Sequence, residues 1–322
     1  MNTDPQAANE QEAAQIEETQ QAEPKPARRF VDYLGLYARG FAMGSSDIVP
    51  GVSGGTMALI LGIYEELLNS VRGVLNREAL GHALHFRFKK ALDLIPWPFL
   101  LAVALGIFSA VLTMSYLLEW VLHHYWSLLF GFFFGLVLAS ILTVSRRVGQ
   151  WGVGPVVALL VGAVGTYLLV GAVPVETPNE WWFFFLSGAL AISAMVLPGI
   201  SGAFVLVLLG KYEPLLSAVT SRDVVTLFWV VAGAGVGIVS FAQVLGWLFK
   251  RFHDVTVAVL IGMLVGSLRK IWPWKEAVEA IERNVSPYGP TWEIVATILL
   301  AVLGFVLIWQ ITAWAERREK PE

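Results

Sequence analysis

Apolar residues run in long continuous stretches along most of this chain, and the lengths of these stretches predict membrane-crossing helices. About 20 apolar residues in a helix cross the hydrocarbon core of a bilayer. Stretches of that length lie at roughly 99–119, 126–145, 154–173, 226–249 and 293–313, with a shorter one at 255–268. Because the apolar residues are continuous rather than alternating, the pattern favours helices over an outer-membrane barrel.

Two further apolar regions, 30–71 and 181–219, are interrupted near their middles by polar turns. The first turn reads Pro-Gly-Val-Ser-Gly-Gly at 50–55, and the second reads Pro-Gly-Ile-Ser-Gly at 198–202. Proline cannot continue the helix before it, and glycine permits backbone shapes that other residues avoid. Each half is too short to cross alone, so both regions are predicted to be re-entrant helical hairpins that enter and leave on one side.

The two hairpins belong to an internal repeat. With an offset of 148 residues, eleven of the 22 positions in 50–71 are identical to those in 198–219, including the Gly-x-Tyr-Glu strings. A second offset of 131 aligns the Gly-x-x-x-Gly motif at 131–135 with that at 262–266, and both motifs are expected to pack helices within the chain. Each half is one hairpin plus three crossings, so the halves have opposite orientations.

The predicted fold class is therefore an all-α polytopic membrane protein with an inverted repeat, as in many transporters. The first repeat is expected at 28–173 and the second at 174–322. Composition agrees, since 56% of residues are hydrophobic and 15% charged, against roughly 45–50% and 25% in soluble domains. Residues 1–27 carry six acids and one base and are expected to be a disordered acidic tail without a secretory signal. The absence of cysteine excludes disulfides and thiolate sites.

Positive charge predicts the orientation, because cytoplasmic loops are enriched in Lys and Arg. The basic loop at 72–98 is expected in the cytoplasm, together with both termini, and the acidic loop around Glu176 and Glu180 outside. Only Arg269 and Lys270 fall outside against this rule, and this exception favours capture of an anionic group over a simple headgroup anchor. Residues 272–292, with Trp272 and then charges at helical spacing, are expected to form an interfacial segment.

The two turns carry groups that attract anions. A half-helix that starts inside the membrane presents free N–H groups at its N-terminus, and these favour negative charge. Because the turns enter from opposite faces, they suggest one central site for an anionic group. The alternative is that the glycines only permit close packing. The candidate contacts are the hydroxyls of Ser53, Thr56 and Ser201 and the backbone of Gly54, Gly55 and Gly202.

Other polar residues keep more than one interpretation each. Arg39 either binds phosphate or extends to the cytoplasmic surface. Asp47 relays protons, or it holds Arg39 or a turn N–H. Direct contact between Asp47 and the anionic group is disfavoured, because a carboxylate would repel it. Glu65 and Glu213 occupy equivalent positions and either cap, pair across the repeat or protonate during transport. The preferred interpretation of the His253-Asp254 pair is a helix cap, although His253 could titrate near neutral pH. The pairs His82/His85 and His123/His124 lack supporting acids, so no metal site is predicted.

These strings resemble the signatures of the bacterial polyprenyl-phosphate translocase family, long catalogued as a domain of unknown function. The resemblance covers about 33–315 and rests on the strings at 43–56, 197–202 and 266–274. It implies return of undecaprenyl phosphate, the carrier lipid of cell-wall synthesis, from the outer to the inner leaflet of the bacterial cytoplasmic membrane. It also implies a basic residue at Arg39. The expected partners are this lipid and the membrane lipids, with a proton or cation for coupling, no cofactor and no nucleic acid.

Two other functions remain open at this point. A phosphatase acting on the same lipid needs a nucleophile or base positioned beside phosphate-binding groups, and no loop combines His with Arg and Ser. A carrier or channel for a small anion would share the central site but would need no lateral opening. Phosphate release and small-anion flux distinguish these functions from lipid translocation.

Overall fold

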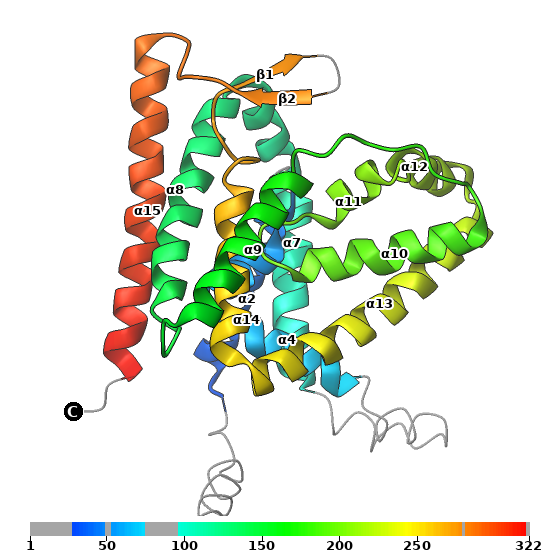
Figure 1. Cartoon of the computed structure of the whole chain (residues 1–322), viewed down its shortest axis with the longest axis horizontal. Coiled ribbons are helices and arrows are strands. Elements are labelled where there is room, and N and C mark those ends of the chain that lie inside the picture. Colours follow the sequence, from blue (N-terminus) through cyan, green and yellow to red (C-terminus); the bar gives the residue numbers. More distant parts are fainter. Residues whose placement is uncertain (1–27, 49–52, 75–95, 279–280, 320–322) are drawn as a thin grey trace, which may run out of the picture.

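The computed structural model describes residues 28–48, 53–74, 96–278 and 281–319, and this part of the chain is helical apart from one two-stranded sheet (Figure 1). The prediction of an all-α polytopic membrane protein is confirmed. The helices up to residue 170 are α2 (Phe30–Ile48), α3 (Gly54–Ile60), α4 (Tyr64–Val74), α7 (Trp97–His124), α8 (Trp126–Ser145) and α9 (Val153–Leu169). Those that follow are α10 (Trp181–Val196), α11 (Gly202–Leu208), α12 (Tyr212–Ser221), α13 (Val224–Arg251), α14 (His253–Ser267) and α15 (Thr291–Glu319).

Four of the described helices are long and apolar enough to cross a membrane: α7, α8, α13 and α15. The helices α9 and α14 are apolar but have only 17 and 15 residues. The expected span at 154–173 therefore ends earlier, at Leu169. The helices α11 and α12 are bent by 104° at the break between them, and such a bend occurs in a broken span or in a re-entrant loop.

The helices pack in four main pairs: α2 with α7, α10 with α13, α8 with α15, and α9 with α14. Glycines allow the close approach. A Cβ added at Gly135 would lie 1.7 Å from the carbonyl oxygen of Ala301 on α15, and one at Gly262 would lie 2.1 Å from that of Leu159 on α9. Both Gly-x-x-x-Gly motifs thus pack helices within the chain, which confirms the prediction made from their spacing.

The half-helices α3 and α11 end with the same hydrogen-bond pattern. The N–H of Ile63 donates to Ala58 O over 3.0 Å, and the N–H of Lys211, 148 positions later, donates to Leu206 O over 2.8 Å. The glycines before them, Gly62 and Gly210, have φ of 73° and 61°. This is the Schellman end of a helix, which requires a left-handed residue and so favours glycine. The Gly-x-Tyr-Glu string therefore ends one helix and starts the next.

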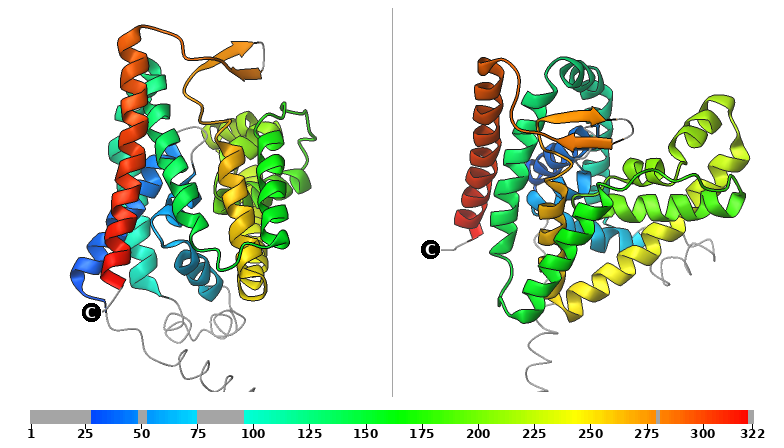
Figure 2. Two further views of the ribbon diagram at one scale, coloured as in Figure 1. Left: turned by 60° about the vertical axis from the view of Figure 1, so that its left-hand side comes forward. Right: turned by 45° about the horizontal axis from the view of Figure 1, so that its top comes forward.

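The expectation for residues 272–292 was wrong in one respect, because its charges do not lie on a helix. The segment forms an antiparallel hairpin of β1 (Lys275–Val278) and β2 (Ile281–Asn284), with Glu276 opposite Arg283. Cross-strand pairs of opposite charge stabilise such a ladder. Figure 2 shows this hairpin at the same end of the molecule as the start of α15.

Candidate functional site

The first turn lies between α2 and α3, and two of its N–H groups are already hydrogen-bonded within the protein. The carboxylate of Asp47 accepts the N–H of Gly54 over 2.6 Å, and the hydroxyl of Ser53 accepts the N–H of Gly55 over 3.1 Å. Pro50, Gly51 and Val52 lie outside the described residues. Of the roles considered for Asp47, the structure shows the one in which it holds a turn N–H.

The second turn contacts the first through one hydrogen bond. Gly199, with φ of 85°, donates its N–H to the hydroxyl oxygen of Thr56 over 2.8 Å. A Cβ at Gly199 would lie 2.9 Å from Met263 O and from the Cβ of Ser267, so the turn also packs tightly on α14. Because Thr56 and Gly199 are 143 residues apart, this hydrogen bond joins the two interrupted regions of the chain.

The start of α3 faces the end of α10. A Cβ at Gly55 would lie 2.7 Å from the carbonyl oxygens of both Met195 and Val196. The hydroxyl of Ser53 also donates to Met195 O, over 3.4 Å. The positive end of one helix dipole thus meets the negative end of another, which is favourable in a low-dielectric interior. By contrast, Ser201 is only half-buried and makes no side-chain cap on α11, while Gly202 is buried against α10.

A cavity of about 200 Å³ opens beside this contact, between α2, α3 and α4 on one side and α7, α10 and α13 on the other. Asp47, Gly54 and Gly55 line it, together with Tyr64. The Tyr64 hydroxyl is buried and has no hydrogen-bond partner among the described residues. The remaining lining is apolar. The cavity therefore combines a carboxylate and a phenol with hydrocarbon walls.

The two cations that break the positive-inside pattern contact different helices. The Arg269 guanidinium donates to Tyr167 O of α9 over 2.9 Å and lies 4.4 Å from the Tyr167 ring centroid. The Lys270 ammonium lies 5.2 Å from the ring centroid of Phe204 on α11, the helix that Ser201 precedes. Lys270 is thus the predicted cation that the structure places beside the second turn.

The structure does not bring Arg39 to either turn contact. Its side chain is exposed on α2, and it makes no hydrogen bond or ion pair with any residue in the described part of the chain. It precedes Asp47 by eight residues, about 12 Å along a helix. Glu65 and Glu213 are exposed in the first turns of α4 and α12, where negative charge favours the helix start. The described residues show no hydrogen bond or ion pair between Glu65 and Glu213.

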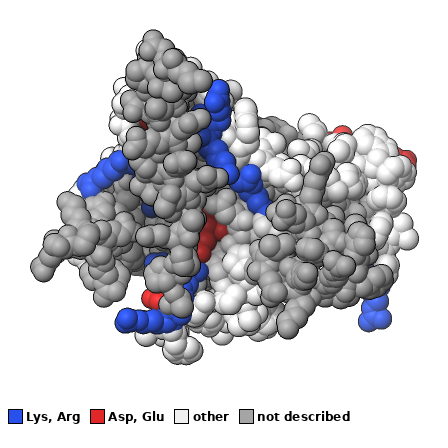
Figure 3. Space-filling model, turned by 90° about the horizontal axis from the view of Figure 1, so that it is seen from below, with Lys and Arg blue, Asp and Glu red and all other residues white. Residues whose placement is uncertain are grey.

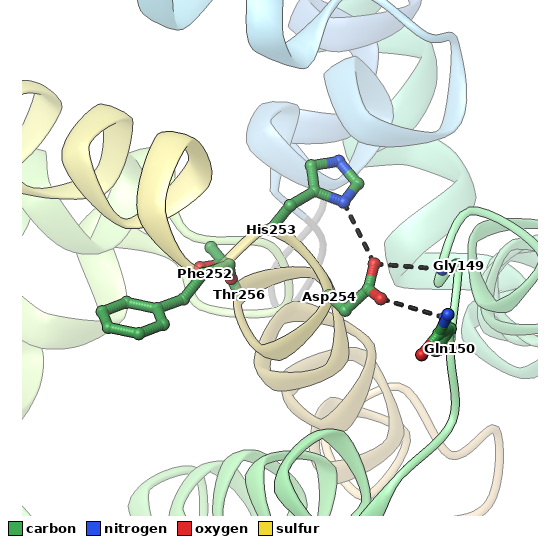
Figure 4. Close-up of polar contacts among 6 residues, drawn as sticks. All are labelled: Gly149, Gln150, Phe252, His253, Asp254 and Thr256. Atoms are coloured by element: carbon green, nitrogen blue, oxygen red, sulfur yellow. Dashed lines mark hydrogen bonds and ion pairs between the residues drawn. The ribbon is translucent and has the colours of Figure 1, made fainter. Parts of the chain in front are cut away.

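The cap expected at Asp254 is replaced by a bond to another segment. Its two carboxylate oxygens accept the N–H groups of Gly149 and Gln150 over 3.0 Å and 2.9 Å (Figure 4). Nδ1 of His253 lies 3.3 Å from the same carboxylate. The helix α14 has no side-chain cap of its own. Asp254 thus fixes the start of α14 to the α8–α9 loop, a contact that depends on tertiary packing and not on local sequence.

Two lysines were not among the functional residues predicted from the sequence. Lys211 is 1% exposed, and its ammonium donates to Thr177 O over 2.9 Å and to Asn179 Oδ1 over 2.7 Å. It aligns with the apolar Ile63 of the first repeat, and that mismatch was the available signal. The Lys275 ammonium lies 5.3 Å from the ring centroids of both Trp126 and Phe130. His82 and His85 lie outside the described residues, and the ring of His124 stacks on Trp120.

Interrupted helices that meet inside a bundle of apolar helices are typical of secondary transporters. The chain belongs to the family described as VCA0040-like, undecaprenyl phosphate translocase-like, whose model matches residues 43–288. A relative from Vibrio cholerae, named polyprenyl-phosphate transporter, is 36% identical over 305 residues, which cover 87% of this chain and 97% of that protein. One from Staphylococcus aureus with the same name is 29% identical over 261 residues, covering 73% and 84%. No solved structure matches the chain.

Proposed function

We propose that this protein translocates undecaprenyl phosphate from the outer to the inner leaflet of the bacterial cytoplasmic membrane. The observation that carries the proposal is the family match, which includes both polar turns and reaches the residues that follow Lys270. The two relatives named polyprenyl-phosphate transporter support the same substrate class. Transport rather than lipid hydrolysis is favoured, because the central polar groups lie among apolar helices.

An inverted repeat, with halves at 28–173 and 174–322, is the architecture we propose for this transport. Under the repeat α2 corresponds to α10, α7 to α13, α8 to α14 and α9 to α15. The main helix pairs follow that correspondence, since α2 packs on α7 as α10 packs on α13, and α8 packs on α15 as α14 packs on α9. The matching Schellman ends of α3 and α11 support it further. Rocking of the halves against each other would expose the centre alternately to each side.

Both termini are proposed to lie in the cytoplasm. The pair Arg146-Arg147 directly follows α8, and α13 ends in the pair Lys250-Arg251. Both helices end at the lower end of the molecule in Figure 1. Seen from below, Lys and Arg side chains lie on several sides of this face (Figure 3). An excess of positive charge is expected on the cytoplasmic side.

The proposed phosphate path leads from Lys270 and Arg269 past Ser201 and Gly202 to the first turn, and on towards Arg39. In this structure Asp47 accepts a hydrogen bond from the N–H of Gly54, and a phosphate oxygen could accept the same hydrogen bond. Phosphate binding at Gly54, Gly55 and Thr56 therefore requires Asp47 to release that N–H. Protonation of Asp47 or binding of a cation would favour release, which makes Asp47 the proposed coupling residue.

Leaflet-resolved assay of undecaprenyl phosphate in proteoliposomes tests the function. We expect wild-type protein to move the lipid between leaflets and to release no inorganic phosphate. Lys270→Gln should slow transport roughly tenfold at low lipid concentration, since a hydrogen bond to a charged group is worth about 1.5–3 kcal/mol. Arg222→Gln removes an exposed cation after α12 and is the matched control. Equal lipid movement with and without protein, or flux of small anions alone, would reject the proposal.

A further inference from the structure

A groove of about 300 Å³ lies between α8, α15 and the Trp272–Trp274 segment. Figures 1 and 2 show α8 and α15 side by side, with β1 and β2 near their upper ends. Phe134 and Leu138 of α8 line one wall, and Ile298 and Val302 of α15 line the other. We call this the upper groove. None of its residues belongs to the phosphate path proposed above.

The apolar walls of the upper groove indicate hydrocarbon rather than water inside it. A water molecule takes about 30 Å³ and needs two to four polar partners, and an apolar cavity stays dry. Ile298 and Val302 are 51% and 54% exposed on a helix that is long and apolar enough to cross a membrane. The groove is therefore open to the bilayer, where chains of lipids are the available occupants.

Two buried hydrogen-bond donors lie behind the wall of the upper groove. The indole N–H of Trp274 and the hydroxyl of Thr297 both belong to residues that line the groove. Trp274 is 7% exposed and Thr297 is 1% exposed, and neither polar atom has a hydrogen-bond partner among the described residues. Buried polar groups are nearly always satisfied. Both groups are covered by protein, so an occupant of the groove contacts an apolar wall.

A cation lies above the groove on the same face of α8. Trp126, Phe130, Phe134 and Leu138 follow one another at intervals of four residues, so they form one row along the helix. The Lys275 ammonium lies over the first two rings, and the groove begins at the third residue of the row. One helical turn, about 5.4 Å, separates Phe130 from Phe134. Positive charge at the top and hydrocarbon below match an anionic lipid.

We propose that the upper groove binds the isoprenoid chain of polyprenyl phosphate next to its headgroup, with the phosphate beside Lys275. This inference rests on the proposed function and adds a chain-binding site to it. A groove of this volume between two helices takes one chain. A polyprenyl phosphate carries its charge on a single chain, whereas a diacyl phospholipid carries it on two.

Photo-cross-linking tests the site directly. The probe is a polyprenyl phosphate with a diazirine on its second isoprene unit, added to the full chain in phosphatidylglycerol nanodiscs. We expect labelled peptides from 134–138 and 298–305. Excess unlabelled undecaprenyl phosphate should reduce the labelling of these peptides at least tenfold, and added phosphatidylglycerol should not reduce it. Equal competition by phosphatidylglycerol would show that the groove holds bulk lipid and would overturn the proposal.

Two variants separate this site from the transport function itself. Val302→Trp fills the groove and should reduce labelling about tenfold, whereas Leu303→Trp, at a neighbouring lipid-facing position with 56% exposure, should not. Lys275→Gln removes the positive charge above the groove, so it should weaken probe binding with the fold intact. Transport without labelling of the groove refutes the chain site alone. A wild-type protein that moves no lipid refutes the proposed function.

Discussion

A single carboxylate determines whether the N–H of Gly54 in the first turn is available to a ligand. Asp47 lies near the end of α2 and accepts the N–H of Gly54 at the start of α3. An anionic ligand approaching that N–H would meet a negative charge already in place. The same side chain lines the central cavity with Tyr64. At the scale of residues, Asp47 therefore has two effects at once: it takes up the N–H of Gly54, and it places a negative charge in the cavity.

Replacing Asp47 by asparagine tests that link. Asp47→Asn keeps an amide oxygen that can accept from Gly54 and removes the charge. Because two like charges about 4 Å apart repel by about 1–4 kcal/mol outside the driest interiors, undecaprenyl phosphate should bind roughly tenfold tighter or more. Isothermal titration calorimetry with purified protein measures this affinity. Asp32→Asn, at an exposed position on the same helix, is the control, and equal affinity for both variants would contradict the role of Asp47.

Thr56 carries the hydrogen bond between the two turns, and its removal should destabilise the centre. Thr56→Val keeps the shape of the side chain but leaves the buried N–H of Gly199 without an acceptor, which costs about 1–3 kcal/mol. Thermal unfolding in detergent should show a lower midpoint for Thr56→Val, and Thr56→Ser should restore most of the loss. If both variants unfold like the wild type, the bond does not hold the turns together.

At the scale of elements, glycine sets how closely the helix pairs approach. Gly162 of α9 faces the Val259 carbonyl of α14, and a Cβ there would lie 2.4 Å from the carbonyl oxygen. Gly165, three residues later on the same helix, has no atom within 4 Å of its added Cβ. The pair thus offers two glycines in one helix with opposite surroundings.

Alanine substitutions at these two glycines should act in opposite directions. Gly162→Ala forces α9 and α14 apart and should lower the midpoint of thermal unfolding. Gly165→Ala meets nothing and should stabilise the helix by up to about 1 kcal/mol, because alanine loses less backbone entropy on folding. Equal effects at the two positions would show that the α9–α14 contact does not depend on glycine.

At the scale of the whole molecule, the proposed inverted repeat predicts on which side of the membrane each loop lies. The chain has no cysteine, so single cysteines can be introduced and labelled with a membrane-impermeant maleimide. If the second hairpin is re-entrant, Ser221→Cys at the end of α12 should be labelled from outside, as should Ser286→Cys after β2. Gln150→Cys in the α8–α9 loop should be labelled only after permeabilisation. Labelling of Ser221→Cys from inside would mean that α10 to α12 cross the membrane as one broken span.

Much of the architecture could be predicted from the sequence because its causes are local. The lengths of the apolar stretches identified α7, α8, α13 and α15, and the register of the repeat identified the equivalent ends of α3 and α11. These features depend on hydrocarbon thickness and on backbone shapes that glycine allows. The β1–β2 hairpin was missed because charges at helical spacing also fit a two-stranded ladder.

Only the tertiary structure decided which partner each polar group takes. The hydroxyl of Thr56 accepts from Gly199, 143 residues away, and Asp254 accepts from Gly149 and Gln150 rather than from its own helix. Spacing along a chain does not determine such partners, because a buried donor or acceptor takes whichever partner the packed helices bring within reach. The sequence alone thus determined that two polar turns interrupt the apolar helices. The packing of the second turn against α3 and α14 decided that the N–H of Gly199 is satisfied by the protein itself.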